Sequence, residues 1–163
     1  MKETLYDNIV SYIVENQNKF YRLAYSYVRN QDDALDVVQN AVYKALTHYE
    51  TLKNENAVKT WFYRILVNES LLFLKTEKWE FPSEDAVNTE TAYYEKGYDT
   101  PDDIYEAVNQ LDEDTQKVIK LRFYEELSLK EIAAVTETNL NTVKSRLYRG
   151  LKLLKQNIEE VTI

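Results

Sequence analysis

The stretch that decides the fold is SLKEIAAVTETNLNTVKSRLYRGLKLLK, which covers Ser128–Lys155. It begins with a capping box, because Ser128 precedes Glu131 by three residues and each side chain can then accept the other residue's backbone N–H. This pattern predicts a short helix through Val135. The segment Thr136–Leu140 predicts a tight turn, after which the helical pattern resumes. A short helix, a tight turn and a longer helix together predict a helix-turn-helix.

The longer helix is expected to begin after Asn141, as its N-terminal cap. The turn before it has no glycine, but Asn139 can adopt the left-handed conformation that such a turn requires. At about 100° per residue the apolar side chains fall on one stripe, which we expect to be buried. The stripe consists of Val143, Leu147, Leu151, Leu154 and Ile158. Gly150 lies at its edge and is expected to let a neighbouring helix approach closely, although glycine lowers helix propensity by about 1 kcal/mol.

The opposite face of the longer helix is basic. Asn139–Lys155 contains five basic residues and no acidic one, whereas the whole chain has 20 Lys and Arg, 28 Asp and Glu, and a net charge of -8. In a helix-turn-helix the N-terminal half of the second helix enters the DNA major groove, where arginine is suited to bidentate contact with guanine. The residues that geometry places on this face are Thr142, Ser145, Arg146, Arg149 and Lys152. The alternative is a solvated basic surface that complements the helix dipole.

The composition limits the remaining possibilities. With 163 residues the chain can form one ordinary domain or two very small ones. It has no cysteine and a single histidine, His48, so we expect no metal and no cofactor, and an enzyme is the weakest interpretation. The start lacks the apolar core of a signal peptide, and no apolar run is long enough to span a membrane. We therefore expect a soluble, cytoplasmic protein.

The distribution of charge divides the chain into three parts. Residues 1–75 have nine basic and nine acidic residues, residues 76–101 have a net charge of -5, and residues 102–163 have a net charge of -3. Both prolines lie in the middle part, and no glycine or proline precedes Pro82. This pattern predicts an all-α fold, with two small helical domains at 1–75 and 102–163 and a flexible acidic linker at 76–101.

Three or four helices are expected in the first domain, depending on whether the first, at Leu5–Val28, breaks near Glu15–Asn18; the others are at Ala34–Leu46 and at about Ala57–Leu74. The expected core residues are Leu35, Val38, Val42 and Leu46 on the second helix, and Val58, Trp61 or Phe62, Ile65, Leu66, Leu72 and Phe73 on the third. Asp36, Gln39 and Tyr43 should form a polar face opposite the first of these stripes. In the second domain, Thr100–Asp103 is a helix-start signal, and Asp112 is expected to cap a helix through Phe123.

These segments resemble a known family. LDEDTQKVIKLRFYEELSLKEIAAVTETNLNTVKSRLYRGLKLLK resembles region four of a bacterial sigma factor. DDALDVVQNAVYKAL, followed by VKTWFYRILVNESLLFLK, resembles region two. With both regions, a linker that does not align and no other domain, the chain resembles the extracytoplasmic-function sigma factors, and within them the sigma-V-like subgroup.

The resemblance implies a protein that binds core RNA polymerase, brings it to promoters and helps to open the DNA. Region two would bind the largest polymerase subunit and the minus-ten element, and region four the minus-thirty-five element. The residues implied for polymerase binding are Asp36, Gln39, Asn40 and Tyr43, with Asn40 standing where the family commonly has glutamate. The residues implied for the minus-thirty-five element are Thr142, Lys144, Ser145, Arg146 and Arg149.

For the minus-ten element the matching residues are Asn54, Asn56, Lys59, Trp61, Arg64 and Asn68. Aromatic rings can stack on unpaired bases, cations can hold phosphate, and an amide can read a base edge. The polar loop Lys53–Asn56 lies where the family captures a base flipped out of the stack. Trp61 has a second interpretation, as an ordinary core residue.

The family also implies an inhibitor. Its members are typically held inactive by an anti-sigma factor, often a membrane-spanning one, in envelope-stress responses, and such a factor would hold this protein at the membrane. The acidic linker would then either mimic nucleic acid in a basic channel of polymerase or serve as a tether. Two other classes remain open: a stand-alone helix-turn-helix regulator, and a helical adaptor between proteins.

Overall fold

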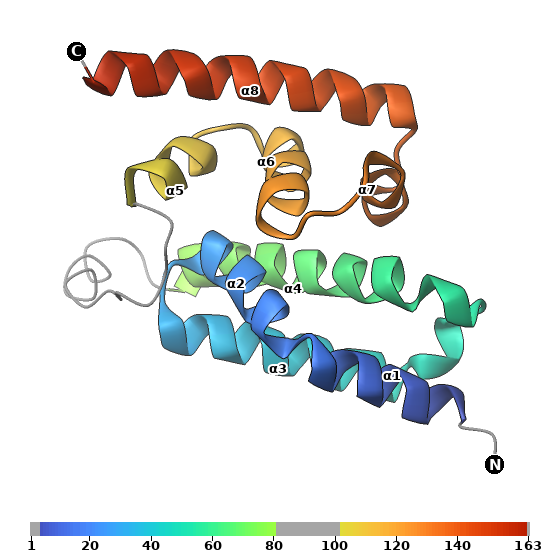
Figure 1. The fold of residues 1–163 in the computed structure, drawn as a ribbon. Helices are drawn as coiled ribbons and strands as arrows, with labels where there is room; N and C mark the ends of the chain where they lie inside the picture. Colours follow the sequence, from blue (N-terminus) through green and yellow to red (C-terminus); the bar gives the residue numbers. More distant parts are fainter. Residues whose placement is uncertain (1–3, 81–101, 163) are drawn as a thin grey trace. The chain divides into compact units, whose positions relative to one another are not determined.

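The computed structural model describes residues 4–80 and 102–162, with side chains described for residues 4–76 and 104–157. Within these ranges every regular element is helical, and the helices form two compact units, α1–α4 and α5–α8 (Figure 1). This confirms the predicted all-α fold of two small helical domains. No helix in the described ranges combines the length and the apolar character that a membrane span requires.

The first unit contains α1 (Leu5–Glu15), α2 (Gln17–Val28), α3 (Gln31–Thr47) and α4 (Val58–Glu80), with short 3-10 turns at Tyr49–Thr51 and Glu55–Ala57. The predicted break in the first helix falls at Asn16, between α1 and α2. Asn30 caps α3, because its Oδ1 accepts a hydrogen bond of 2.9 Å from the backbone N–H of Asp33. The start of α3 therefore follows from a polar side chain that satisfies a free backbone group at a helix end.

The core of the first unit differs from the prediction on α3. Its buried residues are Ala34, Val37, Ala41 and Ala45, which are small and let α2 and α4 pack closely against α3. The predicted stripe that begins at Leu35 lies about 100° further round the helix, and Leu35 is 49% exposed. The prediction of that stripe as the core was therefore wrong, because it favoured large side chains over alanine.

On α4 the core is formed by five consecutive or near-consecutive residues: Trp61, Phe62, Tyr63, Leu66 and Val67. Phe20 of α2 packs against Phe62 and Tyr63, with ring centroids 4.6 and 5.4 Å apart. Leu72 is 49% exposed, so its prediction as a core residue was wrong.

The second unit contains α5 (Asp102–Asn109), α6 (Glu113–Ile119), a π-helical segment (Lys120–Tyr124), α7 (Leu129–Thr136) and α8 (Leu140–Thr162). Asp112 caps α6 as predicted: its Oδ2 accepts a hydrogen bond of 3.1 Å from the Thr115 N–H. The predicted helix through Phe123 continues beyond Ile119 as the π-helical segment. The start signal at Thr100 and Pro101 lies outside the described residues.

α8 crosses α6 at Gly150. A Cβ atom at Gly150 would lie 2.8 Å from Cγ2 of Thr115 and 3.0 Å from Cδ1 and Cγ1 of Ile119. The expected close approach is therefore confirmed, and it shifts the buried face of α8 toward Gly150. Val143 and Leu147 are buried as predicted, but Leu151 is 38% exposed at the margin. Ile158 lies outside the described side chains.

Candidate nucleic-acid interface

The turn between α7 and α8 fixes the direction of the basic helix. The capping box at Ser128 and Glu131 is formed, with hydrogen bonds of 2.9 and 3.1 Å. α7 ends in a left-handed residue, which is Glu137 (φ 58°) and not Asn139, so the expectation for Asn139 was wrong. Instead, Oδ1 of Asn139 accepts a hydrogen bond of 2.8 Å from the Thr142 N–H. Asn139 thus caps α8 in place of the predicted Asn141, and the helix begins at Leu140.

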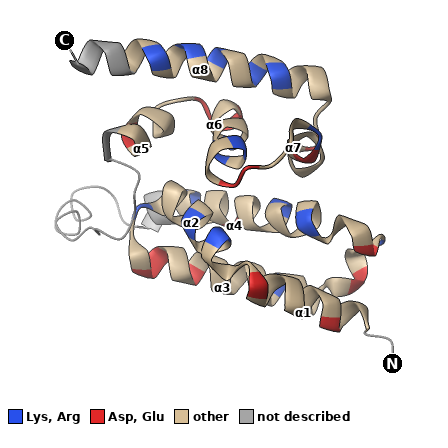
Figure 2. Ribbon diagram, viewed as in Figure 1, with Lys and Arg blue, Asp and Glu red and all other residues tan. Residues whose placement is uncertain are grey.

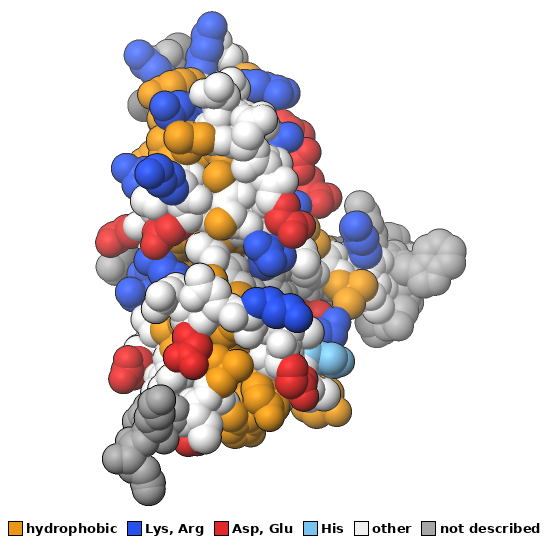
Figure 3. All heavy atoms as spheres, turned by 90° about the vertical axis from the view of Figure 1, so that its right-hand side faces the viewer, with side chains coloured by type: hydrophobic (Ala, Val, Ile, Leu, Met, Phe, Trp, Pro, Cys, Tyr) orange, Lys and Arg blue, Asp and Glu red, His pale blue; other side chains and the backbone are white. Residues whose placement is uncertain are grey.

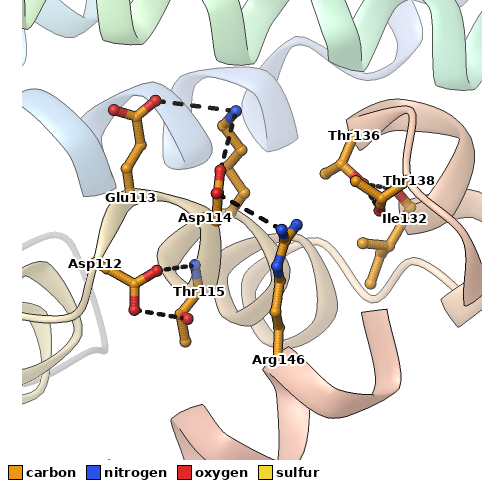
Figure 4. Close-up of polar contacts among 9 residues, drawn as sticks. Asp112, Glu113, Asp114, Thr115, Ile132, Thr136, Thr138 and Arg146 are labelled. Carbon is orange, nitrogen blue, oxygen red and sulfur yellow. Dashed lines mark hydrogen bonds and ion pairs between the residues drawn. The ribbon is translucent and has the colours of Figure 1, made fainter. Parts of the chain in front are cut away.

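A threonine pair closes the end of α7 (Figure 4). The Thr136 hydroxyl donates to the carbonyl of Ile132 at 2.8 Å and lies 2.9 Å from the Thr138 hydroxyl. The Thr138 N–H donates to the carbonyl of Ala133 at 3.1 Å. These bonds satisfy carbonyl groups that the end of a helix leaves open, so the turn has a defined geometry despite its lack of glycine.

Over residues 140–157, where its side chains are described, α8 carries basic residues and no acidic one, and Figure 2 shows only blue charged residues along this part. Near the top of Figure 3, where α7 and α8 lie, basic side chains project among hydrophobic ones. Ser145 and Arg149 of the predicted basic face are exposed, and so is Lys144, which the family resemblance implied. Thr142 and Arg146 are only partly exposed, because they share the i, i+4 row that leads to Gly150 and α6.

One residue of this face was missed in the sequence. Tyr148 is 65% exposed and lies four residues from both Lys144 and Lys152, so the three side chains form one row on the helix. An exposed aromatic ring between two cations suits contact with a nucleic acid. The i, i+4 spacing was present in the sequence, but tyrosine was not counted among the polar residues of the face.

The two arginines of the predicted interface form ion pairs with the first turn of α6. Nη2 of Arg146 lies 3.6 Å from Oδ2 of Asp114, and Nη2 of Arg149 lies 3.5 Å from Oδ1 of Asp112. Lys117 lies 3.9 Å from both Glu113 and Asp114 (Figure 4). The first turn of α6 therefore forms an acidic edge beside α8.

Asp112 has a perturbed pKa. Burial alone would raise it, but hydrogen bonds from the hydroxyl and backbone N–H of Thr115, together with the charge of Arg149, lower the pKa of this carboxyl below its ordinary value. Asp112 is therefore held as an anion by the fold of α6 as well as by the arginine.

The first unit has a polar pocket of about 370 Å³ between α3 and α4. Its lining residues are Lys44, His48, Thr51, Trp61, Arg64, Ile65, Asn68 and Glu69. Three of the residues predicted for the minus-ten element, Trp61, Arg64 and Asn68, are therefore brought together here. Asn54, Asn56 and Lys59 do not line the pocket, and Oδ1 of Asn54 instead accepts a bond of 3.0 Å from the Asn56 N–H.

Trp61 forms a wall of this pocket. It is only 9% exposed, and its indole N–H donates to the Thr51 hydroxyl at 3.2 Å. On the other side Lys44 forms an ion pair with Glu69, whose side chain is almost buried. Lys44 and Thr51 were not predicted for this site, although Lys44 on α3 and His48 at its C-cap have the same i, i+4 spacing as Arg64 and Asn68 on α4.

A second hollow, of about 800 Å³, is an apolar groove between α1, α2 and α3. Its lining residues are Ile13, Val14, Gln17, Asn18, Tyr21, Leu35, Val38, Gln39, Val42, Tyr43 and Leu46. The stripe of α3 that was expected in the core is thus the floor of a surface groove. Gln39 and Tyr43 line the groove with this stripe, so the prediction that they lie on the opposite face was wrong. Asp36 and Asn40 are exposed and do not line it.

Comparison with known proteins places both units in one family. Residues 12–80 match the family described as Sigma-70 region 2, and residues 102–154 match the family described as Sigma-70, region 4. The chain is 42% identical to the RNA polymerase sigma factor SigV of Bacillus subtilis, over 94% of this chain and 93% of that protein. It is 31% identical to the ECF RNA polymerase sigma-E factor of Haemophilus influenzae, over 88% of this chain and 83% of that protein.

Solved structures agree with these matches. The sigma factor RpoE of Bartonella quintana, in complex with the anti-sigma factor NepR, aligns with a TM-score of 0.73 and 25% identity. The alignment covers 91% of this chain and 95% of that one. CnrH, in complex with the cytosolic domain of CnrY, has the same fold, with a TM-score of 0.70, 17% identity and coverage of 93% and 88%.

Proposed function

Because the chain belongs to the extracytoplasmic-function RNA polymerase sigma factors, a family of non-enzymatic transcription initiation factors, we propose that it binds core RNA polymerase and directs it to promoters. The observation that carries the proposal is that both units match sigma factors in one chain, over 94% of its length. A stand-alone helix-turn-helix regulator would account for the second unit only. It would leave the pocket and the apolar groove of the first unit without a role.

The second unit would bind the minus-thirty-five element through α8. Lys144, Ser145 and Arg149 are exposed on the face that a helix-turn-helix presents to the major groove. Tyr148 adds an apolar ring to this face. Thr142 and Arg146 lie at the margin nearest α6, where they would contact the phosphate backbone at the edge of the groove.

The first unit would hold one unpaired base of the minus-ten element in the polar pocket. Arg64 and Asn68 lie one turn apart on α4 and both line the pocket, so a cation and an amide face the same space. A base edge can be read by an amide, and a charged donor can hold the adjoining phosphate. Trp61 contributes a wall through its buried ring, since it is too buried to serve as an open stacking platform. Lys59, Asn54 and Asn56 would contact the flanking strand from outside the pocket.

The apolar groove would bind a helix of polymerase. Its floor is the stripe from Leu35 to Leu46, and Tyr43, 70% exposed, stands at its side. An amphipathic helix that lays its apolar face in such a groove is a common mode of recognition. Asp36, Gln39 and Asn40 would make polar contacts at and beside the rim.

An anti-sigma factor would compete for these surfaces. The RpoE structure was solved with such a factor, NepR, and it aligns with this chain over both units. We extend this to the chain described here and propose that an anti-sigma factor covers the groove and blocks polymerase. That the factor is anchored in the membrane and responds to envelope stress is implied by the family alone.

The test is transcription in vitro with purified bacterial core polymerase on a library of upstream sequences. Addition of the full chain should produce transcripts that share two upstream elements at a fixed spacing. Arg149→Ala should weaken dependence on the upstream element, and Asn68→Ala should weaken dependence on the element near the start site. Gln156→Ala, at an exposed position of α8 beyond the proposed interface, is the matched control. Absence of any new transcripts with an active core would overturn the proposal.

A further inference from the structure

The arginines that α8 presents to DNA already have partners within the second unit. Arg149 pairs with Asp112 at 3.5 Å and Arg146 pairs with Asp114 at 3.6 Å. Within the described residues, no ion pair involves Lys144 or Lys152 of the same helix. The acidic edge of α6 thus engages the two arginines of the interface and leaves these two lysines to solvent.

The acidic edge belongs to the start of α6, and its first carboxylate is held without the arginines. Asp112 is held by two hydrogen bonds from Thr115, at 2.9 and 3.1 Å, as the cap of α6. Asp114 lies in the first turn of the same helix, where a negative charge is favoured by the helix dipole. The Asp112 carboxylate is therefore fixed by the cap of α6, Asp114 projects from the first turn of the same helix, and the long arginine side chains reach across to them.

The pairs are loose enough to exchange. Separations of 3.5 and 3.6 Å exceed the length of a good charge-assisted hydrogen bond, which is about 2.7–2.9 Å. The side chain of Arg149 is 64% exposed and that of Asp112 is 48% exposed, so water screens their attraction. Each guanidinium approaches its carboxylate through Nη2, and a DNA phosphate would attract the same group, so phosphate and carboxylate are alternative anions for one cation.

We propose that Asp112 and Asp114 compete with DNA phosphates for Arg149 and Arg146, and so lower the affinity of the free protein for duplex DNA. This inference rests on the proposed function of α8. Exposed ion pairs contribute about 0.2–1 kcal/mol, which corresponds to a change of about 1.4- to 5-fold in affinity for each pair. Both pairs together would keep the protein weakly bound until polymerase contributes further contacts.

The test uses the full chain and a fluorescein-labelled 20-base-pair duplex of fixed, arbitrary sequence, at low salt, with anisotropy as the readout. Asp112→Asn removes the charge but keeps a good helix cap, and Asp114→Asn removes the second charge. Glu113→Gln is the matched control, since Glu113 lies in the same turn and its only ion pair among the described residues is with Lys117. We expect each asparagine variant to bind about 1.4- to 5-fold more tightly than Glu113→Gln.

A double-mutant cycle assigns the effect to the arginines. When Arg149 is replaced by alanine in both proteins, Asp112→Asn should bind the duplex no more tightly than Glu113→Gln. When Arg146 is replaced by alanine in both proteins, the same should hold for Asp114→Asn. The inference is overturned if the asparagine variants equal the control, if they bind more weakly, or if their advantage persists without the arginine.

A separate pair of variants distinguishes this inference from the proposed function. Lys144→Ala and Lys152→Ala should weaken binding, because they remove cations from the face that contacts DNA. If they do so while the asparagine variants equal Glu113→Gln, only the competition is wrong. If neither lysine affects binding, α8 is not the DNA-binding surface, and both conclusions are overturned.

Discussion

The crossing of α8 over α6 predicts that Gly150→Ala destabilises the second unit. The new Cβ would lie 2.8 Å from Cγ2 of Thr115 and 3.0 Å from two side-chain carbons of Ile119. Overpacking of this kind costs about 1–3 kcal/mol, whereas alanine in place of glycine gains about 1 kcal/mol of helix propensity. The net loss is about 0–2 kcal/mol, and the contact with the less adjustable Thr115 places it in the upper half of this range.

Hydrogen exchange followed by mass spectrometry measures this loss within one unit of the full chain. Amides of α6 and α8 should exchange up to about 30-fold faster in Gly150→Ala, while amides of α2 and α4 provide an internal control in the same molecule. Thr115→Ser removes Cγ2 but keeps the hydroxyl that bonds Asp112 at 2.9 Å, so it should relieve part of the effect when combined with Gly150→Ala. Slower exchange in Gly150→Ala, or no relief from Thr115→Ser, would refute the close packing of α8 on α6.

Three further predictions follow from individual contacts. Glu137→Gly should stabilise α7 by about 1 kcal/mol, because Glu137 has a φ of 58° that glycine adopts without strain. Slower hydrogen exchange of the α7 amides would show this stabilisation, and faster exchange would contradict it. The pKa of Asp112 is lowered in the folded state, so the Asp112 carboxylate stabilises the fold fully above the ordinary carboxyl pKa of about 3.9, and this stabilisation is lost as the pH falls through the lower folded value. The difference in thermal unfolding temperature between the unchanged chain and Asp112→Asn should therefore shrink below about pH 4. A difference that stays constant with pH would contradict this. Arg64→Ala should reduce promoter opening by about tenfold, because it removes a charged donor from the pocket, while duplex binding through α8 stays unchanged. Permanganate reactivity of unpaired thymines measures promoter opening, and anisotropy measures duplex binding. Equal loss of opening and of duplex binding would assign Arg64 a structural role.

The helix boundaries were the most predictable part of the fold. Ser128, Asp112 and Asn30 each lie at a boundary where a side-chain oxygen satisfies a backbone N–H, and this chemistry is local in the sequence. The cap of α8 was placed two residues late, at Asn141. Asn139 and Asn141 both have the required side chain, and only the left-handed geometry of Glu137 decides between them.

The core of the first unit was less predictable. On α3 a stripe of large apolar residues and a stripe dominated by alanine lie about 100° apart, and either could face the core. The alanines are buried because α2 and α4 approach closely, which depends on partners distant in the sequence. The large residues are left for a surface groove, and an unexpected apolar groove in this place indicates a binding partner.

The residue types of the candidate site could be predicted from the sequence, but which residues lie together in the structure could be predicted only in part. Arg64 and Asn68 were correctly grouped, because they are one helical turn apart. Lys44 was missed because it comes from α3 and meets them only through the packing of α3 against α4. Similarly, the pairing of Arg146 with Asp114 depends on the crossing at Gly150, which the sequence suggested without naming the partner helix.

The most direct test of the central claim is the binding of the labelled full chain to purified bacterial core RNA polymerase in the absence of DNA. We expect tight binding, which Tyr43→Ala and Leu35→Gln should weaken because both residues line the apolar groove. Tyr148→Ala is the matched control, as a similarly exposed tyrosine on the proposed DNA face, and should bind like the unchanged chain. No binding to polymerase, together with tight, sequence-specific binding of the chain alone to duplex DNA, would contradict the account and make the protein a stand-alone regulator.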